Sequence, residues 1–242
     1  MEIALFVILG LAIGSFLNVV ILRIPENESI LFPASHCPKC KAKLKFYHNI
    51  PVLSWIFLGG KCAYCKEKIS IQYPLIELGT SIIFLISYLK SGDIEHGIIL
   101  GLLFSLLFAL SIIDLKYKAV PDLVSFPALF ISFFARDFLN SFSDALMFAG
   151  GFTLLRMIVS WIIKKEAMGE ADIIISAIIG ATLGVNLGLS AIYISAIIAL
   201  PAFLLVGKKG FQLPFIPFLT LGLFITWLMD KYILDILDKI YG

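Results

Sequence analysis

The chain of 242 residues is too apolar to be a water-soluble protein. Hydrophobic residues make up 60% of it and charged residues only 15%, whereas a soluble domain carries about 25% charged residues. The mean hydropathy is +1.00. The net charge of +2 says little by itself, because the placement of the basic residues matters more, and we expect no nucleic-acid partner. The composition therefore excludes a soluble enzyme and predicts a protein of the lipid bilayer.

Eight apolar stretches are candidates for membrane helices, each of which needs about 20 residues. They cover residues 3–22, 73–89, 97–113, 123–135, 145–163, 169–187, 189–206 and 211–229. The fourth stretch is short for a full crossing, so seven spans are the alternative. No basic segment precedes the first stretch, which favours a retained helix over a signal peptide. The sequence predicts an all-α polytopic membrane protein with about eight transmembrane helices.

Basic residues are unevenly distributed between the loops. With eight spans, the loops 23–72, 114–122, 164–168 and 207–210 lie on one side of the membrane and contain fourteen of the nineteen Lys and Arg residues. Because Lys and Arg accumulate in cytoplasmic loops, this asymmetry predicts that all four loops are cytoplasmic and that both termini lie outside.

Four cysteines occur together in the long loop between the first two spans. They form two C-x-x-C pairs separated by 21 residues, Cys37 with Cys40 and Cys62 with Cys65. Two such turns can direct four thiolates at one tetrahedral ion, so the spacing predicts a structural zinc site. Disulfides are the alternative, but a cytoplasmic loop lies in a reducing compartment; a redox pair is a further alternative.

These observations predict four regions. They are a first transmembrane helix (1–22), a small cytoplasmic zinc-ribbon-like domain (23–72), a seven-helix membrane domain (73–230) and a C-terminal tail (231–242).

Four acidic residues stand at predicted span ends on the cytoplasmic side: Glu77, Asp114, Asp122 and Asp172. Ionisable groups at membrane depth are costly and are therefore candidates for function. Under the eight-span topology, Asp114 and Asp172 lie at the same level. Two facing carboxylates share a proton and can activate water against a peptide bond. The alternatives are that each acid only caps a helix, and that Asp122 takes the place of Asp114.

Several motifs along nearly the whole chain resemble those of the bacterial prepilin peptidase family. They are Gly14-Ser15-Phe16-Leu17-Asn18-Val19-Val20 with Arg23-Ile24-Pro25, Ser35-His36-Cys37-Pro38-Lys39-Cys40, Asn49-Ile50-Pro51-Val52-Leu53-Ser54-Trp55, Gly60-Lys61-Cys62, Tyr73-Pro74-Leu75-Ile76-Glu77, the segment from Asp114 to Asp122, Met168-Gly169-Glu170-Ala171-Asp172 and Pro214-Phe215-Ile216-Pro217-Phe218-Leu219.

The resemblance implies a bacterial inner-membrane aspartic protease with Asp114 and Asp172 as its catalytic residues. It implies cleavage of type IV prepilins and of the pseudopilins of type II secretion, between a leader peptide and an apolar helix. It also implies methylation of the new N-terminus with S-adenosylmethionine, for which Asn49, Gly60 and Lys61 are the candidate binding residues. It does not imply an oligomeric state.

The sequence departs from the family pattern at three positions. Ala171 stands where the family has glycine, Ile216 stands where glycine is frequent, and Ile174 stands where lysine is common. None of the three replaces a catalytic atom. Two other classes of function remain possible from the residues alone: a proton-coupled transporter that uses the buried acids, and a zinc-bearing membrane scaffold without catalysis.

Overall fold

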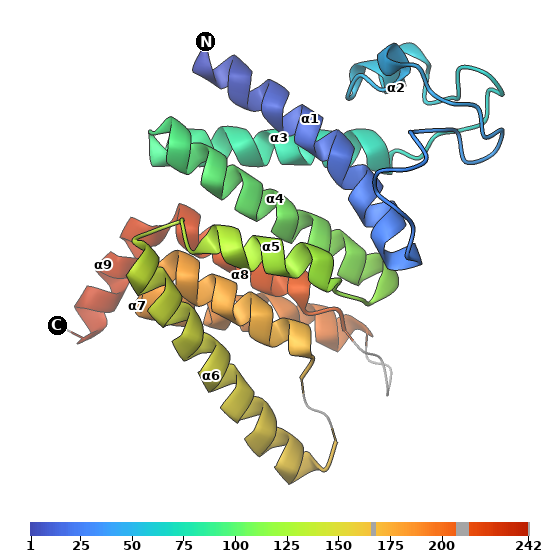
Figure 1. Cartoon of the computed structure of the whole chain (residues 1–242). Helices are drawn as coiled ribbons and strands as arrows, with labels where there is room; N and C mark the ends of the chain where they lie inside the picture. Colours follow the sequence, from blue (N-terminus) through green and yellow to red (C-terminus); the bar gives the residue numbers. More distant parts are fainter. Residues whose placement is uncertain (166–167, 207–212, 242) are drawn as a thin grey trace. The chain divides into compact units, whose positions relative to one another are not determined.

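The computed structural model describes residues 1–165, 168–206 and 213–241, and its regular elements in these ranges are helices (Figure 1). The longer helices are α1 (Glu2–Arg23), α3 (Gln72–Ser91), α4 (Ile94–Tyr117), α5 (Asp122–Ser132), α6 (Phe138–Ile163), α7 (Glu170–Val206), α8 (Ile216–Leu228) and α9 (Asp230–Tyr241). Short elements η1 (Ile24–Glu26), η2 (Phe46–His48) and α2 (Leu53–Phe57) lie before α3. The chain forms two compact units, Met1–Ser105 and Leu106–Gly242.

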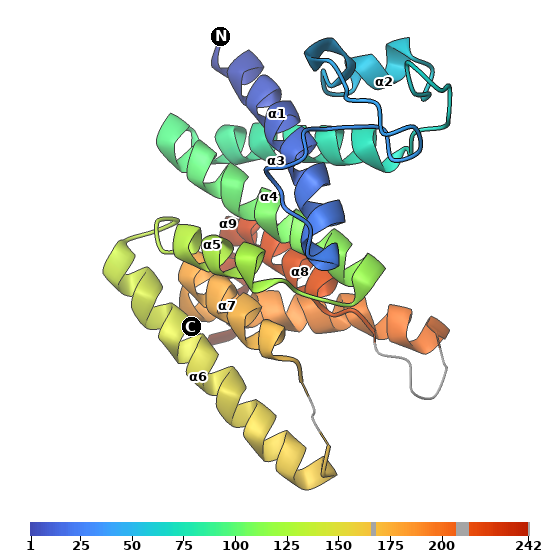
Figure 2. The same cartoon turned by 45° about the vertical axis from the view of Figure 1, so that its right-hand side comes forward.

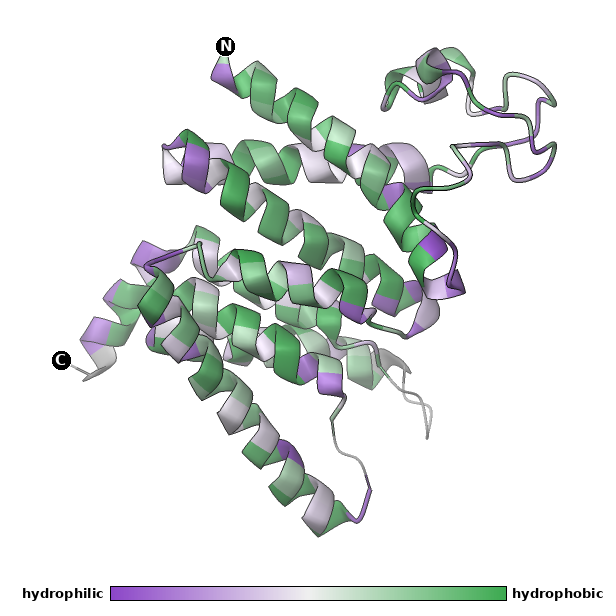
Figure 3. Ribbon diagram, viewed as in Figure 1, coloured by the Kyte–Doolittle hydropathy of each residue, from purple (hydrophilic) through white to green (hydrophobic). Residues whose placement is uncertain are grey.

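Five of these helices are long and apolar enough to cross a membrane, namely α1, α3, α4, α6 and α7. Together α8 and α9 form a sixth candidate, which is bent by 82° between the two helices. Figure 3 shows that hydrophobic residues dominate the five long helices, whereas α9 is mixed. The predicted all-helical membrane fold is thereby confirmed. Two of the eight predicted spans fall within α7, and the short fourth one corresponds to α5, which has 11 residues.

In the first unit, α1 and α3 pack against each other through small residues. A Cβ atom on Gly10 would lie 2.5 Å from the Cα of Ser81, and one on Gly14 would lie 2.7 Å from the Cα of Glu77. The two backbones are therefore in contact, as is typical of small-x-x-x-small sequences in membrane helices. The buried Asn18 adds a hydrogen bond from Nδ2 to the carbonyl oxygen of Tyr73 (3.1 Å).

In the second unit, α7 is interrupted at Gly184, where the chain reverses its direction (Figures 1 and 2). The Gly184 backbone has φ 76° and ψ −175°, a conformation that is essentially restricted to glycine. A Cβ atom there would also lie 2.6 Å from Nη1 of Arg136. The two halves of α7 correspond to the predicted spans 169–187 and 189–206, with the break four residues earlier than expected.

Small residues also bring α5, α6 and α7 together. A buried cluster contains Ala145 of α6 with Ala177 and Ala181 of α7. The predicted C-terminal tail forms α9, which directly follows the bend after α8. Residue 211, where the eighth span was expected to begin, lies outside the described residues.

Candidate functional site

Asp114 lies in the last turns of α4 and is buried, with 7% of its surface exposed. Its Oδ2 accepts a hydrogen bond from the backbone N–H of Ile216, the first residue of α8 (3.2 Å). One turn earlier in α4, the Ser111 hydroxyl donates to Oγ1 of Thr220 (3.1 Å). The amino end of α8, where partial positive charge gathers, is therefore held against the Asp114 carboxylate.

Asp172 lies in the first turn of α7 and is half-buried. Its Oδ2 accepts a hydrogen bond from the backbone N–H of Gly169 (3.1 Å), which precedes the helix. This is the reciprocal half of a capping box, in which a side chain of the first turn binds the N-cap amide. The helix cap considered from the sequence is thus present, and it fixes the position of the carboxylate.

The two aspartates are close enough for the charge of Asp114 to act on Asp172. Like charges that share a partly buried site favour a state in which one group holds a proton. Asp122, the alternative first acid, is exposed at the start of α5. The arrangement can therefore supply an acid and a base from one pair of side chains, as aspartic proteases do.

The four cysteines of the first unit come together. One thiol sulfur from each of Cys37, Cys40, Cys62 and Cys65 lies within 4.8 Å of the others. The Sγ atoms of Cys37 and Cys65 are 3.8 Å apart, which equals the edge of a tetrahedron with metal–sulfur bonds of about 2.3 Å. All four are free thiols. Their chemistry and spacing fit a zinc ion.

The two C-x-x-C turns have the same backbone structure. In the first, Lys41 N–H donates to Cys37 O, and in the second, Lys66 N–H donates to Cys62 O. Lys41 and Lys66 both adopt a left-handed conformation, with φ of 56° and 60°. An isolated β-bridge flanks each turn, His36 with Lys43 and Lys61 with Lys68. The shared geometry is that of two zinc knuckles.

The surroundings of the thiols favour a thiolate at one of them. Backbone N–H groups of Cys65 and Tyr64 donate to the Cys62 sulfur and lower the pKa of this thiol to about 7. At Cys65 the backbone N–H of Glu67 lowers the pKa of the thiol. Loss of solvent and the neighbouring thiols raise it by more, and the resulting pKa is about 11. Four clustered sulfurs cannot all ionise without a cation among them.

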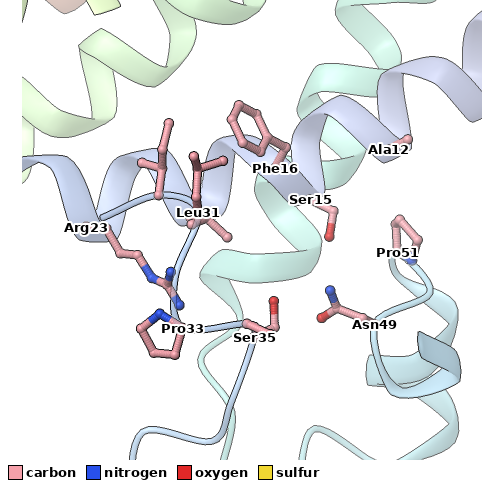
Figure 4. A pocket seen from close by; sticks show the side chains of 12 residues that line it. Ala12, Ser15, Phe16, Arg23, Leu31, Pro33, Ser35, Asn49 and Pro51 are labelled. Carbon is pink, nitrogen blue, oxygen red and sulfur yellow. The ribbon is translucent and has the colours of Figure 1, made fainter. Parts of the chain in front are cut away.

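The three residues predicted to bind the methyl donor have different surroundings. Asn49 is exposed and lines an open cavity beside α1 (Figure 4). Gly60 is buried with φ 67°, and a Cβ atom on it would lie 2.9 Å from the ring of Trp55. Lys61 is exposed on its β-bridge with Lys68.

Two contacts were not anticipated from the sequence. The N–H of Ile216 binds Asp114, although the motif around Ile216 was noted. Glu77 is buried, and its Oε2 accepts a hydrogen bond from the N–H of Val52 (2.7 Å). The second contact could have been suspected from the sequence, because Glu77 is an acidic residue near the start of an apolar stretch.

Known proteins resemble the chain over most of its length. Residues 8–91 match the bacterial peptidase A24 N-terminal domain. A prepilin leader peptidase/N-methyltransferase of Myxococcus xanthus is 40% identical over 73% of this chain, a match that spans 54% of that relative. A type 4 prepilin-like proteins leader peptide-processing enzyme of Escherichia coli is 34% identical over 88% of both chains. A prepilin leader peptidase/N-methyltransferase of Vibrio cholerae is 34% identical over 81% of this chain and 83% of its own length.

No solved structure matches the chain. Residues 101–204 match the type IV leader peptidase family, and the relatives cover both units. The chain therefore belongs to the type IV leader peptidase family and carries the N-terminal domain of its bacterial members.

Proposed function

We propose that this protein removes the leader peptide from type IV prepilins and type II secretion pseudopilins, and then methylates the new N-terminal amine. The names of relatives such as those from Myxococcus xanthus and Vibrio cholerae support both activities. The observation that carries the proteolytic function is that the second unit holds two partly or fully buried aspartates, Asp114 and Asp172, and a backbone N–H binds the carboxylate of each.

The proposed cleavage uses the aspartate pair as acid and base. The ionised carboxylate takes a proton from water as the water oxygen attacks the scissile carbonyl carbon, and the protonated carboxyl donates its proton to the carbonyl oxygen. Collapse of the tetrahedral species then breaks the C–N bond, and the amine leaves with a proton from the pair. The N–H groups of Ile216 and Gly169 keep the two carboxylates in place during these transfers.

We further propose the eight-span topology in the inner membrane, with the basic loops and the zinc-binding segment in the cytoplasm. Two features support it. The two halves of α7 run in opposite directions about Gly184, and the basic residues gather in loops that alternate spans would place on one side. The proposed regions of the chain are a first transmembrane helix (1–22), a cytoplasmic zinc-binding domain (23–72), a membrane protease domain (73–230) and a C-terminal tail (231–242).

The cysteine cluster is proposed to hold structural zinc. Zinc would supply a crosslink between the two knuckles, and four thiolates complete its coordination without an open position for water. The segment has few buried side chains besides Cys37 and Cys62, so the metal would replace a hydrophobic core. S-adenosylmethionine is the proposed methyl donor, and Asn49, Gly60 and Lys61 of the same unit are proposed to support its binding.

The proteolytic function is tested by Asp114→Asn and Asp172→Asn in the purified full chain with a prepilin substrate. Asparagine keeps the volume but cannot exchange the proton, so each change should lower kcat by about 100-fold or more. Asp122→Asn is the matched control and should cleave like the wild type, because Asp122 is exposed at the start of α5.

Other outcomes of the same cleavage assay would contradict the roles proposed for Asp114 and Asp172. Loss of cleavage in Asp122→Asn together with normal cleavage in Asp114→Asn would show that Asp122 is the first catalytic acid. Normal cleavage in Asp172→Asn would exclude a two-aspartate mechanism.

A further inference from the structure

An open cavity of about 500 Å³ lies in the first unit beside α1 (Figure 4). One wall is a single face of α1 that includes Ser15, Phe16 and Arg23, and the other wall comes from residues 30–35 with the Asn49–Pro51 turn. Sites for small organic ligands have volumes of about 300–1,000 Å³ and combine apolar walls with a few polar groups. The cavity fits this description.

The polar groups are placed at two ends of the cavity. Figure 4 shows Ser15, Ser35 and Asn49 pointing their polar atoms toward the same open space, with Arg23 at the other end beside Pro33. One N–H of the Arg23 guanidinium donates to the carbonyl oxygen of Ser29 (3.0 Å). Its other N–H groups can bind a carboxylate in the bidentate manner typical of arginine. No acidic residue lines the cavity, so its charge suits a ligand with an anionic end.

Glu77 of α3 connects the two walls. Its buried carboxylate accepts a hydrogen bond from Val52 N–H (2.7 Å), next to the Asn49–Pro51 turn, and another from the Ser15 hydroxyl on α1. Val52 has φ 62° and ψ −51°, which is a strained backbone conformation for a β-branched residue. Such strain persists only where surrounding contacts impose it and is frequent at ligand sites. Glu77 supplies such a contact.

We propose that this cavity binds the methyl donor, S-adenosylmethionine, with Arg23 on its carboxylate, Asn49 on its adenine, and Glu77 as the residue that positions both walls. The assignment rests on the proposed methyl-transfer function. The amide of Asn49 offers one donor and one acceptor, which match the adjacent amine and ring nitrogen of adenine. The hydroxyls of Ser15 and Ser35 suit ribose hydroxyls.

Bound in the cavity, the donor would supply the methyl group of its sulfonium: the amine lone pair would form the N–C bond as the S–C bond breaks, S-adenosylhomocysteine would be the leaving group, and the amine would give its proton to water. The residues of the chain bind and orient the donor. Gly60 and Lys61 are not among the lining residues; Gly60 packs against Trp55.

Equilibrium binding of radiolabelled S-adenosylmethionine to the full-length, zinc-loaded protein in detergent tests the assignment without measuring activity. Arg23→Ala and Asn49→Ala should each weaken binding by about 10-fold or more, since each removes polar contacts to the ligand. Lys43→Ala, an exposed change in the same unit outside the cavity, is the matched control and should bind like the wild type. Zinc content should stay constant in all three variants.

Glu77 is tested by a pair of variants. Glu77→Ala should raise the KM for the donor by about 10-fold or more without changing the KM for cleavage of prepilin. Glu77→Gln should recover most of this loss, because its amide oxygen can still accept from Val52 N–H. Equal rises in both KM values, or unchanged donor binding in Glu77→Ala, would refute the positioning role.

The binding experiment distinguishes a wrong cavity assignment from a wrong methyl-transfer function. Wild-type affinity in both Arg23→Ala and Asn49→Ala would overturn the cavity assignment and leave the proposed function intact. No binding of the donor to a wild-type protein that cleaves prepilin would overturn the methyl-transfer function itself, and the cavity assignment with it.

Discussion

At Asp114 the important partner is a backbone group rather than a side chain. Ile216 donates its N–H to the Asp114 carboxylate, and any residue except proline provides the same donor. Isoleucine at this position, where the resemblance led us to expect glycine, therefore leaves the contact intact. The Ile216 side chain is 2% exposed, so its contribution is to packing.

Ile216→Ala separates these two roles. Loss of the buried side chain should lower the free energy of unfolding by about 2–5 kcal/mol, seen as a lower thermal midpoint in detergent. Prepilin cleavage at a temperature where the variant is folded should stay within about threefold of the wild type, because the N–H remains. A folded variant as inactive as Asp114→Asn would show that the side chain itself acts in the site.

The four-cysteine loop is an element with little core of its own, and its two C-x-x-C turns have matching hydrogen bonds. An exposed ion pair, Lys39 to Glu67 (2.6 Å), connects them. Hydrogen bonding and the charge of Glu67 raise the pKa of Lys39, but exposed pairs of this kind contribute little to stability. The thiols are therefore the part of the loop on which its folding depends.

Removal of zinc by a chelator, or the change Cys37→Ser or Cys62→Ser, should expose residues 36–70 to added protease, because the metal stands in for a core. Methylation should fall more than cleavage, since the aspartate pair lies in the other unit. Lys39→Ala is the control and should keep its zinc. Equal losses of methylation and cleavage in the cysteine variants would contradict this division.

The reversal within α7 depends on one residue with an unusual backbone. Gly184→Ala should destabilise the second unit by at least about 1–3 kcal/mol, because its φ of 76° disfavours a side chain and the new Cβ meets Arg136. Gly150→Ala on α6 is the matched control, since its Cβ has no neighbour within 4 Å. Thermal unfolding in detergent compares the two, and equal midpoints would show that the reversal does not need glycine.

For the whole molecule the main prediction is the topology. Reporter fusions should give a fluorescent, cytoplasmic green fluorescent protein after Lys118 and Lys165, and an active, external alkaline phosphatase after Asp137. Only an odd number of crossings between Lys118 and Asp137 gives opposite signals there, and α5 is the helix between them. The same signal at both positions would support the seven-span alternative, with α5 not crossing.

Much of this protein can be predicted from its sequence because the deciding patterns are local. Apolar stretches such as 97–113 predict membrane helices, because lipid allows few charged residues within a span. Two C-x-x-C turns predict a clustered set of thiols, because each turn directs its own pair of sulfurs. The motifs also predicted the family of the chain, which its similarity to known proteins confirms.

Only the tertiary structure decided contacts between distant segments. The bond from Ile216 to Asp114 joins residues 102 positions apart, and nothing local to either residue specifies it. The burial of Asp114 and the exposure of Asp122, and the bond from Val52 to Glu77, depend on how helices pack. Packing is set by the shapes of many side chains at once, so short motifs identify the chemical groups and the folded chain determines which of them meet.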